Sequence, residues 1–327
     1  MRIPKLLADI GGTNARFALE TSPGVLSAVN ILACTQYPQL ADAMRAYLQS
    51  DEARAAGADQ VKNVGIAIAN PIHGDLVQMT NHHWSFSIEA IRTQFQFETL
   101  DVVNDFTALA MALPRLNNQQ LKQVGGRTTV AGSAIGLLGA GTGLGVSGLI
   151  PSENGWKPLH SEGGHVSFSP ANQREIAILE FAWQEFEHVS TERLLSGPGL
   201  KLIYRALAAM QNKVADDIEA SEILQRGLNQ ECRICTEVLS CFCEMLGTMA
   251  GNLAVTLGAR GGIYIGGGIV PRLGDYINQS GFRCRFEQKG RFTQYLSDIP
   301  VFVIIEPYPA FIGLSALLET SPTLIAA

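Results

Sequence analysis

Two glycine-rich turns in this sequence have the composition of phosphate-binding loops. The first is Asp9-Ile-Gly-Gly-Thr-Asn14 and the second is Gly139-Ala-Gly-Thr-Gly-Leu-Gly145. Glycines let backbone N–H groups approach an anion closely, a threonine hydroxyl can donate to a phosphate oxygen, and Asp9 can hold Mg²⁺ directly or through a water molecule. Neither turn is a Walker loop, because the lysine is missing. Glycines between two strands also form plain hairpin turns, so the first turn alone leaves both interpretations open.

A carboxylate follows almost directly on a predicted strand. The strand covers Thr99–Val103 and delivers Asn104 and Asp105 to the loop or helix start behind it. Ligands of α/β proteins gather at strand ends. Asp105 can accept the proton of a hydroxyl group there while Asn104 holds a neighbouring hydroxyl, and an ordinary carboxylate suffices if the hydroxyl attacks a phosphate. The alternative is that Asn104 or Asp105 caps a helix that begins near Thr107.

Three later segments carry further polar or glycine-rich groups. In Ser161-Glu-Gly-Gly-His165, Glu162 can accept from two neighbouring hydroxyls and His165 can donate to one, although His165 can equally be structural or bind a metal. Glu192 follows Ser190 and Thr191, so it can belong to a helix cap instead of a site. The glycines at 266–268 permit a flat backbone approach to an adenine or a ribose, or form a strand-to-helix turn.

The two glycine-rich turns lie in similar supersecondary units. Apolar runs on both sides of the first turn, within Lys5–Glu20, predict a β-hairpin. The second turn lies in a similar hairpin, within Ala134–Ile150, and the two copies align with a one-residue slip. A dinucleotide fingerprint would need a helix after the glycines, where another apolar run follows. Two copies of one supersecondary unit, far apart in the chain, predict a duplicated domain in which each half begins with a phosphate-sized turn.

Strands and helices alternate between and after the hairpins, which predicts a layered α/β fold. The apolar patterns predict strands at Val61–Ala69, Thr99–Val103, Gly262–Ile265 and Val301–Ile305. They predict helices at Gln39–Leu48, Ala108–Leu113, Ile176–Phe186, Lys201–Ala209, Glu231–Leu257 and Ala310–Leu318.

Length and composition bound the class of protein. A chain of 327 residues exceeds the size of one ordinary core, so two domains with a cleft between them are expected. The hydrophobic fraction of 46% and the charged fraction of 17% are typical of a folded chain. A net charge of −6 without any cluster of lysine and arginine argues against nucleic-acid binding.

The sequence also argues against export and membrane insertion. Asp9 and its glycines cut the first apolar run below signal-peptide length, and polar residues, glycine or proline interrupt every stretch that approaches a membrane span. We therefore expect a cytoplasmic protein. The cysteines at 232, 235, 241 and 243 fall within one predicted helix, and we interpret them as helix packing residues rather than a metal site or disulfides.

Taken together and in this order, the motifs resemble the bacterial glucokinase family, in its branch without a structural zinc. The resemblance covers nearly the whole chain. It rests on Asp9–Arg16, Thr80-Asn81, Asn104–Ala108, Gly139–Gly145, Glu162–His165, Leu195–Gly199 and Gly266–Arg272. A related repressor and sugar-kinase family follows its E-x-G-H element with a zinc-binding cysteine cluster. Here the next cysteine after His165 is Cys232, which leaves His165 for sugar. One departure is Asn70, to which we attach no function.

The resemblance implies an actin-like (ribonuclease H-like) ATPase fold of two duplicated α/β domains. The smaller would hold residues 1–115 plus 306–327 and the larger residues 116–305. It also implies a homodimer that binds ATP with Mg²⁺ and D-glucose, phosphorylates the 6-hydroxyl as the first step of glycolysis, and closes over its sugar. Asp105 matches the general base, and glucose ligands match Asn104, Glu162, His165 and Glu192. Nucleotide positions match Asp9, Gly11, Gly12, Thr13, Gly141, Thr142, Gly143 and Gly267.

Two alternatives stay open at this point. An enzyme of the same fold can act on another hexose, an N-acetylhexosamine or a polyol, since fold does not fix the acceptor. A sugar-responsive regulator without catalysis is disfavoured, because no helix-turn-helix extension precedes Lys5 and the matching base is present.

Overall fold

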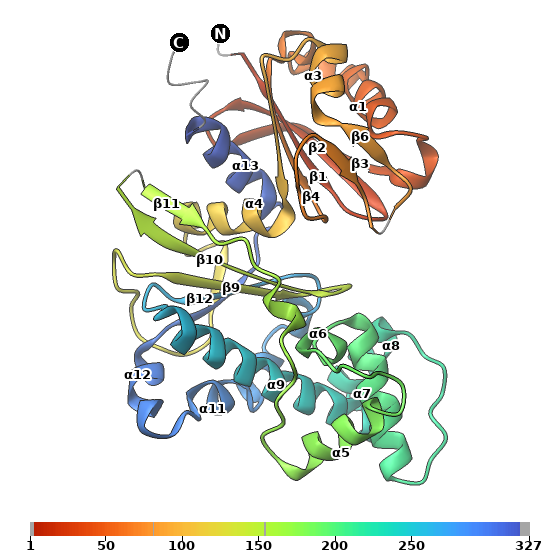
Figure 1. The fold of residues 1–327 in the computed structure, drawn as a ribbon, viewed down its shortest axis with the longest axis vertical. Coiled ribbons are helices and arrows are strands. Elements are labelled where there is room, and N and C mark those ends of the chain that lie inside the picture. The colour runs from red at the N-terminus through yellow and green to blue at the C-terminus, as the bar shows by residue number, and fades with distance from the viewer. Residues whose placement is uncertain (1–2, 81, 154, 321–327) are drawn as a thin grey trace. The chain divides into compact units, whose positions relative to one another are not determined.

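The computed structural model describes residues 3–80, 82–153 and 155–320, and the chain divides into two compact units. The first unit combines Met1–Leu116 with Pro307–Ala327, and the second is Asn117–Glu306. In Figure 1 the first unit therefore contains the red and orange strands together with the blue C-terminal helix.

The first unit is built on a five-stranded sheet in the order β3-β2-β1-β4-β7. The strands are β1 (Lys5–Ile10), β2 (Asn14–Ser22), β3 (Val25–Ala33), β4 (Asn63–Ile68) and β7 (Thr99–Asn104). Strands β1, β2 and β3 pair antiparallel, while β4 lies parallel to both β1 and β7. The predicted first hairpin is confirmed.

Alternation along β1 gives each face of this sheet its own core. Leu6, Ala8 and Ile10 belong to the core that also contains residues of α1 (Leu40–Leu48). Leu7 packs on the opposite face with Phe311 and other residues of the C-terminal helix. Because side chains two apart share a face of a strand, Asp9 projects from the same face as Leu7.

Helices α4 (Asp105–Ala112) and α13 (Pro309–Thr320) cover that face (Figure 1). They approach each other so closely that a Cβ on Gly313 would clash with the backbone carbonyl of Ala108. The unit is completed by α2 (Asp51–Ala55), α3 (Ile88–Phe95) and a two-stranded sheet of β5 (Leu76–Gln78) and β6 (Ser85–Ser87).

The second unit repeats the strand order of the first. Its sheet runs β11-β10-β9-β12-β13-β8, with β9 (Ile135–Ala140), β10 (Leu144–Ser152) and β11 (Gly155–Pro158) antiparallel and β12 (Ile263–Gly266) and β13 (Val301–Ile304) parallel to β9. The added edge strand β8 (Leu121–Gln123) is antiparallel. The five-strand repeat confirms the predicted duplication.

Helices of the second unit surround α9 (Arg233–Leu257), which packs against α7 (Gly197–Met210), α8 (Ala220–Leu228) and α11 (Phe282–Glu287). The remaining helices are α5 (Gln173–Ala182), α6 (Thr191–Leu194), α10 (Tyr276–Gln279) and α12 (Thr293–Asp298). The predicted long helix is confirmed, with Cys232 as its N-cap and Cys235, Cys241 and Cys243 fully buried in the core.

The prediction that every apolar stretch is too interrupted for a membrane span was wrong for α9. By length and composition α9 is long and apolar enough to cross a membrane, with a mean hydropathy of 1.4 over its most apolar window. However, 67% of its most apolar window is buried inside the protein, as in the core helix of a folded domain.

Candidate functional site

Asp105 is the first residue of α4, at the end of strand β7. Asn104 is the N-cap, and its Oδ1 accepts hydrogen bonds from the backbone N–H groups of Phe106 at 2.9 Å and Thr107 at 3.3 Å. The predicted cap by Asn104 is confirmed, and the helix begins at Asp105, slightly before Thr107, because Asn104 satisfies the amide donors of the first turn. Asn104 is thus a helix cap, and this cap makes Asp105 the first residue of the helix.

The Asp105 carboxylate is held by two donors and partly removed from water. Its Oδ1 accepts from the Asn104 side-chain amide at 3.0 Å and from the Phe106 N–H at 2.9 Å. Burial raises the pKa of Asp105 to about 6, the Phe106 N–H opposes this rise, and the nearby negative charge of Asp9 adds to it. An oriented carboxylate with this pKa can accept a proton near neutral pH.

Asn70 supports Asn104 from the next loop, a contact that the sequence did not reveal. The Asn104 amide also donates to the Asn70 carbonyl at 3.4 Å. The side chain of Asn70 is buried, accepting from the Thr80 N–H at 3.0 Å and donating to the Pro71 carbonyl at 2.9 Å. Asn81, which follows Thr80 in the family motif, lies outside the described residues.

Asp9 lies opposite Arg16 in the first hairpin, and the two form an ion pair at 2.8 Å. Burial raises the pKa of the Asp9 carboxyl, whereas the Arg16 guanidinium lowers it. This role of Arg16 was not apparent from the sequence. Among the described residues no group of three or more His, Cys, Asp or Glu side chains is placed to hold a metal ion. A single carboxylate suits Mg²⁺ that takes its other ligands from water and phosphate oxygens.

The first turn is closed by its own backbone and anchored from behind. The Gly11 N–H donates to the Asn14 carbonyl at 3.0 Å. Cys34, just after β3, donates its N–H to the Thr13 carbonyl at 2.9 Å and its thiol to the Gly11 carbonyl at 3.5 Å. Thr13 itself is exposed, so the turn presents its hydroxyl at the surface.

The second turn is one residue shorter, which explains the slip between the two copies. Ile10 pairs with Ala15 in the first hairpin, whereas Ala140 pairs with Leu144 in the second. The Gly141 N–H donates to the Gly143 carbonyl at 2.8 Å, and Thr142 is exposed at the tip. In both turns an exposed threonine therefore lies next to glycine in a turn closed by a backbone hydrogen bond.

The glycines after β12 lie beside this second turn. Gly267 has a φ of 82° and would clash with the Ala140 carbonyl if it carried a Cβ, so its own structure demands glycine. Gly268 has no atom within 4 Å of an added Cβ. The open approach that the sequence suggested for this run is therefore found at Gly268, whereas the family resemblance matched Gly267.

The Glu-Gly-Gly-His segment is packed onto strand β10. A Cβ on Gly164 would clash with the Leu144 carbonyl, and one on Gly163 would lie 2.9 Å from the Val146 side chain. Its glycines therefore allow the segment to pack closely on the strand. Residues 163–165 form a short 3₁₀ turn, and the side chains of Glu162 and His165 are exposed on it.

Glu192 does not cap its helix. Ser190 is the N-cap of α6, and its hydroxyl accepts from the Arg193 N–H at 3.3 Å. The Glu192 carboxylate instead accepts a hydrogen bond from the Leu144 N–H, at 2.7 Å, directly after the second turn. A cap at Ser190 is confirmed, but the interpretation of Glu192 as part of it was wrong, because the Glu192 carboxylate accepts from Leu144 and not from the first turn of α6.

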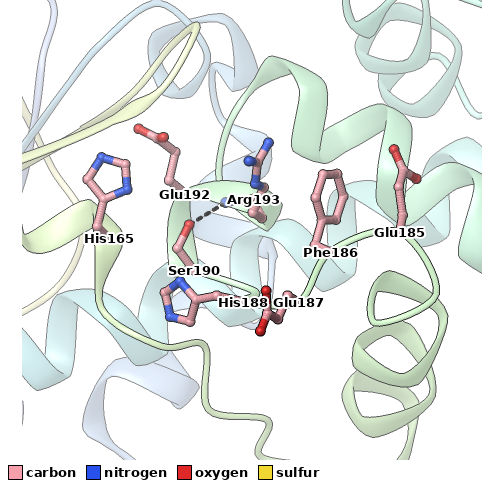
Figure 2. Close-up of a pocket in the computed structure, with 8 residues that line it drawn as sticks. All are labelled: His165, Glu185, Phe186, Glu187, His188, Ser190, Glu192 and Arg193. Atoms are coloured by element: carbon pink, nitrogen blue, oxygen red, sulfur yellow. Dashed lines mark hydrogen bonds between the residues drawn. The ribbon is translucent and has the colours of Figure 1, made fainter.

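His165 and Glu192 lie on the wall of one pocket of about 470 Å³ in the second unit (Figure 2). Arg193 also lines it, with its guanidinium 4.3 Å from the centre of the Phe186 ring. The pocket mixes carboxylates, imidazoles and a hydroxyl, which are groups that bind a polyhydroxylated molecule. The other lining residues are Glu185, Phe186, Glu187, His188 and Ser190.

The chain is similar to proteins of known name along nearly all of its length. A family model described as Glucokinase matches residues 6–321. The chain is 54% identical over 316 residues to "Bifunctional protein glk" of Burkholderia pseudomallei, covering 96% of this chain and 48% of that protein. It thus spans about half the length of the first curated relatives that it matches. It is also 54% identical over 313 residues to "Glucokinase" of Chromobacterium violaceum, covering 96% of this chain and 88% of that protein.

The solved structures give the same picture. A crystal structure of glucokinase from an Antarctic psychrotroph superposes with a TM-score of 0.88 at 35% sequence identity, covering 98% of this chain and all of the other.

Proposed function

The chain belongs to the glucokinase family, and on this basis we propose that it transfers the γ-phosphoryl group of ATP to the 6-hydroxyl of D-glucose. The products are glucose 6-phosphate and ADP, and the reaction is the first step of glycolysis. The fold is the actin-like ATPase fold of these relatives. The observation that carries the proposal is the Asp105 carboxylate, which two donors orient at the end of a strand and whose pKa burial raises to about 6.

Asp105 is the general base in this proposal. It accepts the proton of the 6-hydroxyl as the oxygen attacks the γ-phosphorus, and the bond to the leaving ADP oxygen breaks. The Asn104 amide acts mainly as a positioning group, because its oxygen caps α4 and its nitrogen is shared between Asp105 and Asn70. A hydroxyl of the sugar bound to Asn104 would replace the long contact to Asn70.

Glu162, His165 and Glu192 are the remaining proposed glucose ligands. Support comes from the exposed position of the first two on one 3₁₀ turn and from the pocket that His165 and Glu192 share. Carboxylates accept from pairs of neighbouring hydroxyls, and an imidazole can donate to a third, so this set suits a sugar with several adjacent hydroxyls.

The two glycine turns are the proposed phosphate-binding loops. Gly11, Gly12 and Thr13 form the first, and Gly141, Thr142 and Gly143 form the second, with both threonines exposed. Gly267 and its open neighbour Gly268 are proposed to lie along the nucleotide. Asp9 would hold Mg²⁺ through water, and the ion would neutralise charge on the phosphate oxygens.

We further propose that the protein acts in the cytoplasm as a homodimer, without nucleic-acid or membrane partners. The family resemblance supports this assembly, and sedimentation of the purified protein tests it.

The proposed activity is tested with a panel of sugars in a coupled assay of ADP release. We expect D-glucose to give the largest kcat/KM, with fructose, N-acetylmannosamine and a polyol at least about a hundredfold lower, because a hydroxyl that is replaced or lies elsewhere leaves its hydrogen-bonding partner in the site unpaired. A higher kcat/KM for another acceptor would mean that this acceptor, and not D-glucose, is the substrate.

A further inference from the structure

We infer that the Glu192 carboxylate serves the sugar site and the second phosphate turn at once, so that the shape of this turn sets the affinity for glucose. The inference deepens the proposed function and rests on it, because that proposal makes Glu192 a glucose ligand. It adds a physical connection between the two substrates inside the second unit.

The connection starts with a short hydrogen bond. The Leu144 N–H, the first amide after Gly141-Thr142-Gly143, donates to Glu192 Oε2 at 2.7 Å. A Cβ on Gly143 would lie only 2.5 Å from this same oxygen. The carboxylate therefore rests directly against the turn, and glycine at 143 provides its space.

Other parts of the sugar site contact the turn from a second side. Gly164, beside His165, packs so closely on the Leu144 carbonyl that a Cβ would clash with it. The Gly197 N–H, which follows α6, donates to the Gly141 carbonyl at 2.8 Å. The segments that carry His165 and Glu192 thus hold both ends of the turn.

A carboxylate can serve both substrates because it has two oxygens with two lone pairs each. While Oε2 accepts from Leu144, the group still faces the pocket that it shares with His165 (Figure 2). A sugar hydroxyl that binds the carboxylate fixes its position and with it the Leu144 amide. By linkage, a nucleotide that needs this arrangement of the turn must then favour glucose by the same factor.

The decisive experiment changes the nucleotide turn and measures sugar binding without any nucleotide. Gly143→Ala places a methyl group against Glu192 Oε2, which must move because it is the flexible end of its side chain. Gly141→Ala is the matched control, since its nearest atom would be the Gly268 nitrogen at 3.9 Å. Neither glycine has a positive φ, so alanine fits both backbones.

Titration calorimetry with D-glucose gives the result. We expect Gly143→Ala to weaken glucose binding about tenfold, which corresponds to one charge-assisted hydrogen bond, and Gly141→Ala to bind like the wild type. Equal affinities of the two variants would overturn the inference while leaving the proposed function intact. A wild-type protein that binds no glucose would overturn both.

If Gly143→Ala does not fold, a second measurement tests the same inference. ADP is titrated with and without saturating glucose into the wild type, Glu192→Asp and Glu162→Gln. Glucose should tighten ADP binding by about five- to a hundredfold in the wild type. Glu192→Asp should lose most of this factor because its side chain is one methylene shorter, whereas Glu162→Gln should weaken glucose binding and keep the factor. An unchanged factor in Glu192→Asp would contradict the shared role.

Discussion

The negative charge of Asp105 lies in a partly buried place, where it lowers the free energy of unfolding. An ordinary aspartate has a pKa near 3.9 in an unfolded chain, whereas burial raises the pKa of this carboxyl to about 6. Between these two pH values the folded protein binds more protons than the unfolded chain, so stability falls as pH rises through this window. Above about pH 6 the penalty is complete, as expected where a site keeps a reactive group ready at the expense of folding.

Replacement of the carboxylate should therefore stabilise the fold. We expect Asp105→Asn to raise the free energy of unfolding by about 2 kcal/mol at pH 7.5 and by almost nothing at pH 4. Urea-induced unfolding at both pH values measures the difference. An equal gain at both would mean that the effect does not come from the charge.

The same pKa predicts the pH dependence of catalysis. Asp105 must be ionised to accept a proton, so kcat/KM for glucose should fall about tenfold for each unit of pH below about 6. A buffer series from pH 4.5 to 8 with the coupled assay shows the midpoint. An acid limb centred near 4 would assign the titration to a group with an unperturbed pKa.

For single residues, the sequence predicted the candidate site residues better than it predicted their contacts. Asn104 and Asp105 follow a strand, and that pattern identified both, although capping and chemistry turned out to be compatible tasks of neighbouring residues. The contact of Glu192 with Leu144 was not predictable, because 48 residues of chain separate them. Tertiary contacts of this kind leave no periodic signal.

Among the elements, the hairpins were the most predictable and the edge strands the least. Glycine turns between two apolar runs predicted the pairings β1–β2 and β9–β10. Strand β3 was missed because it is an edge strand whose residues are exposed or only half-buried, so its alternation is weak. Strand β8 has only three residues, too few for any pattern.

The close contact of α13 with α4 should be sensitive to a single methyl group. We expect Gly313→Ala to destabilise the protein by about 3 kcal/mol, because the new Cβ meets the fixed backbone carbonyl of Ala108. Gly65→Ala is the control on the other side of α13, where the Cβ meets only the Leu314 and Leu318 side chains at 3.3 Å or more. Urea midpoints compare the two, and equal midpoints would contradict this account of the helix contact.

For the whole molecule, the sequence pattern predicted the duplicated sheet, whereas the return of the C-terminal helix to the first unit was expected only from the family resemblance. Self-similarity predicted two related halves, and both sheets share the five-strand order. Pattern alone did not show where the last helix packs. The structure places Phe311, Leu314 and Leu318 of α13 in the core of the first unit, beside Leu7 and Ala67.

The two units should therefore differ as isolated fragments. Residues 117–306 contain a complete sheet and their own large core, so this fragment should unfold cooperatively when expressed alone. Residues 1–116 lack α13 and keep only α4 on one face of their sheet, so they should not. Calorimetry of both fragments checks this, and a cooperative transition of the shorter one would show that α13 is dispensable.

The proposed mechanism depends on the carboxylate of Asp105, which takes the proton from the sugar hydroxyl that attacks ATP. Glucose phosphorylation by the wild type and Asp105→Asn is compared, with glucose affinity determined by calorimetry on the same samples. We expect kcat to fall about a thousandfold while the Kd for glucose changes less than about threefold. A variant that binds glucose and still turns over at nearly the wild-type rate would contradict it.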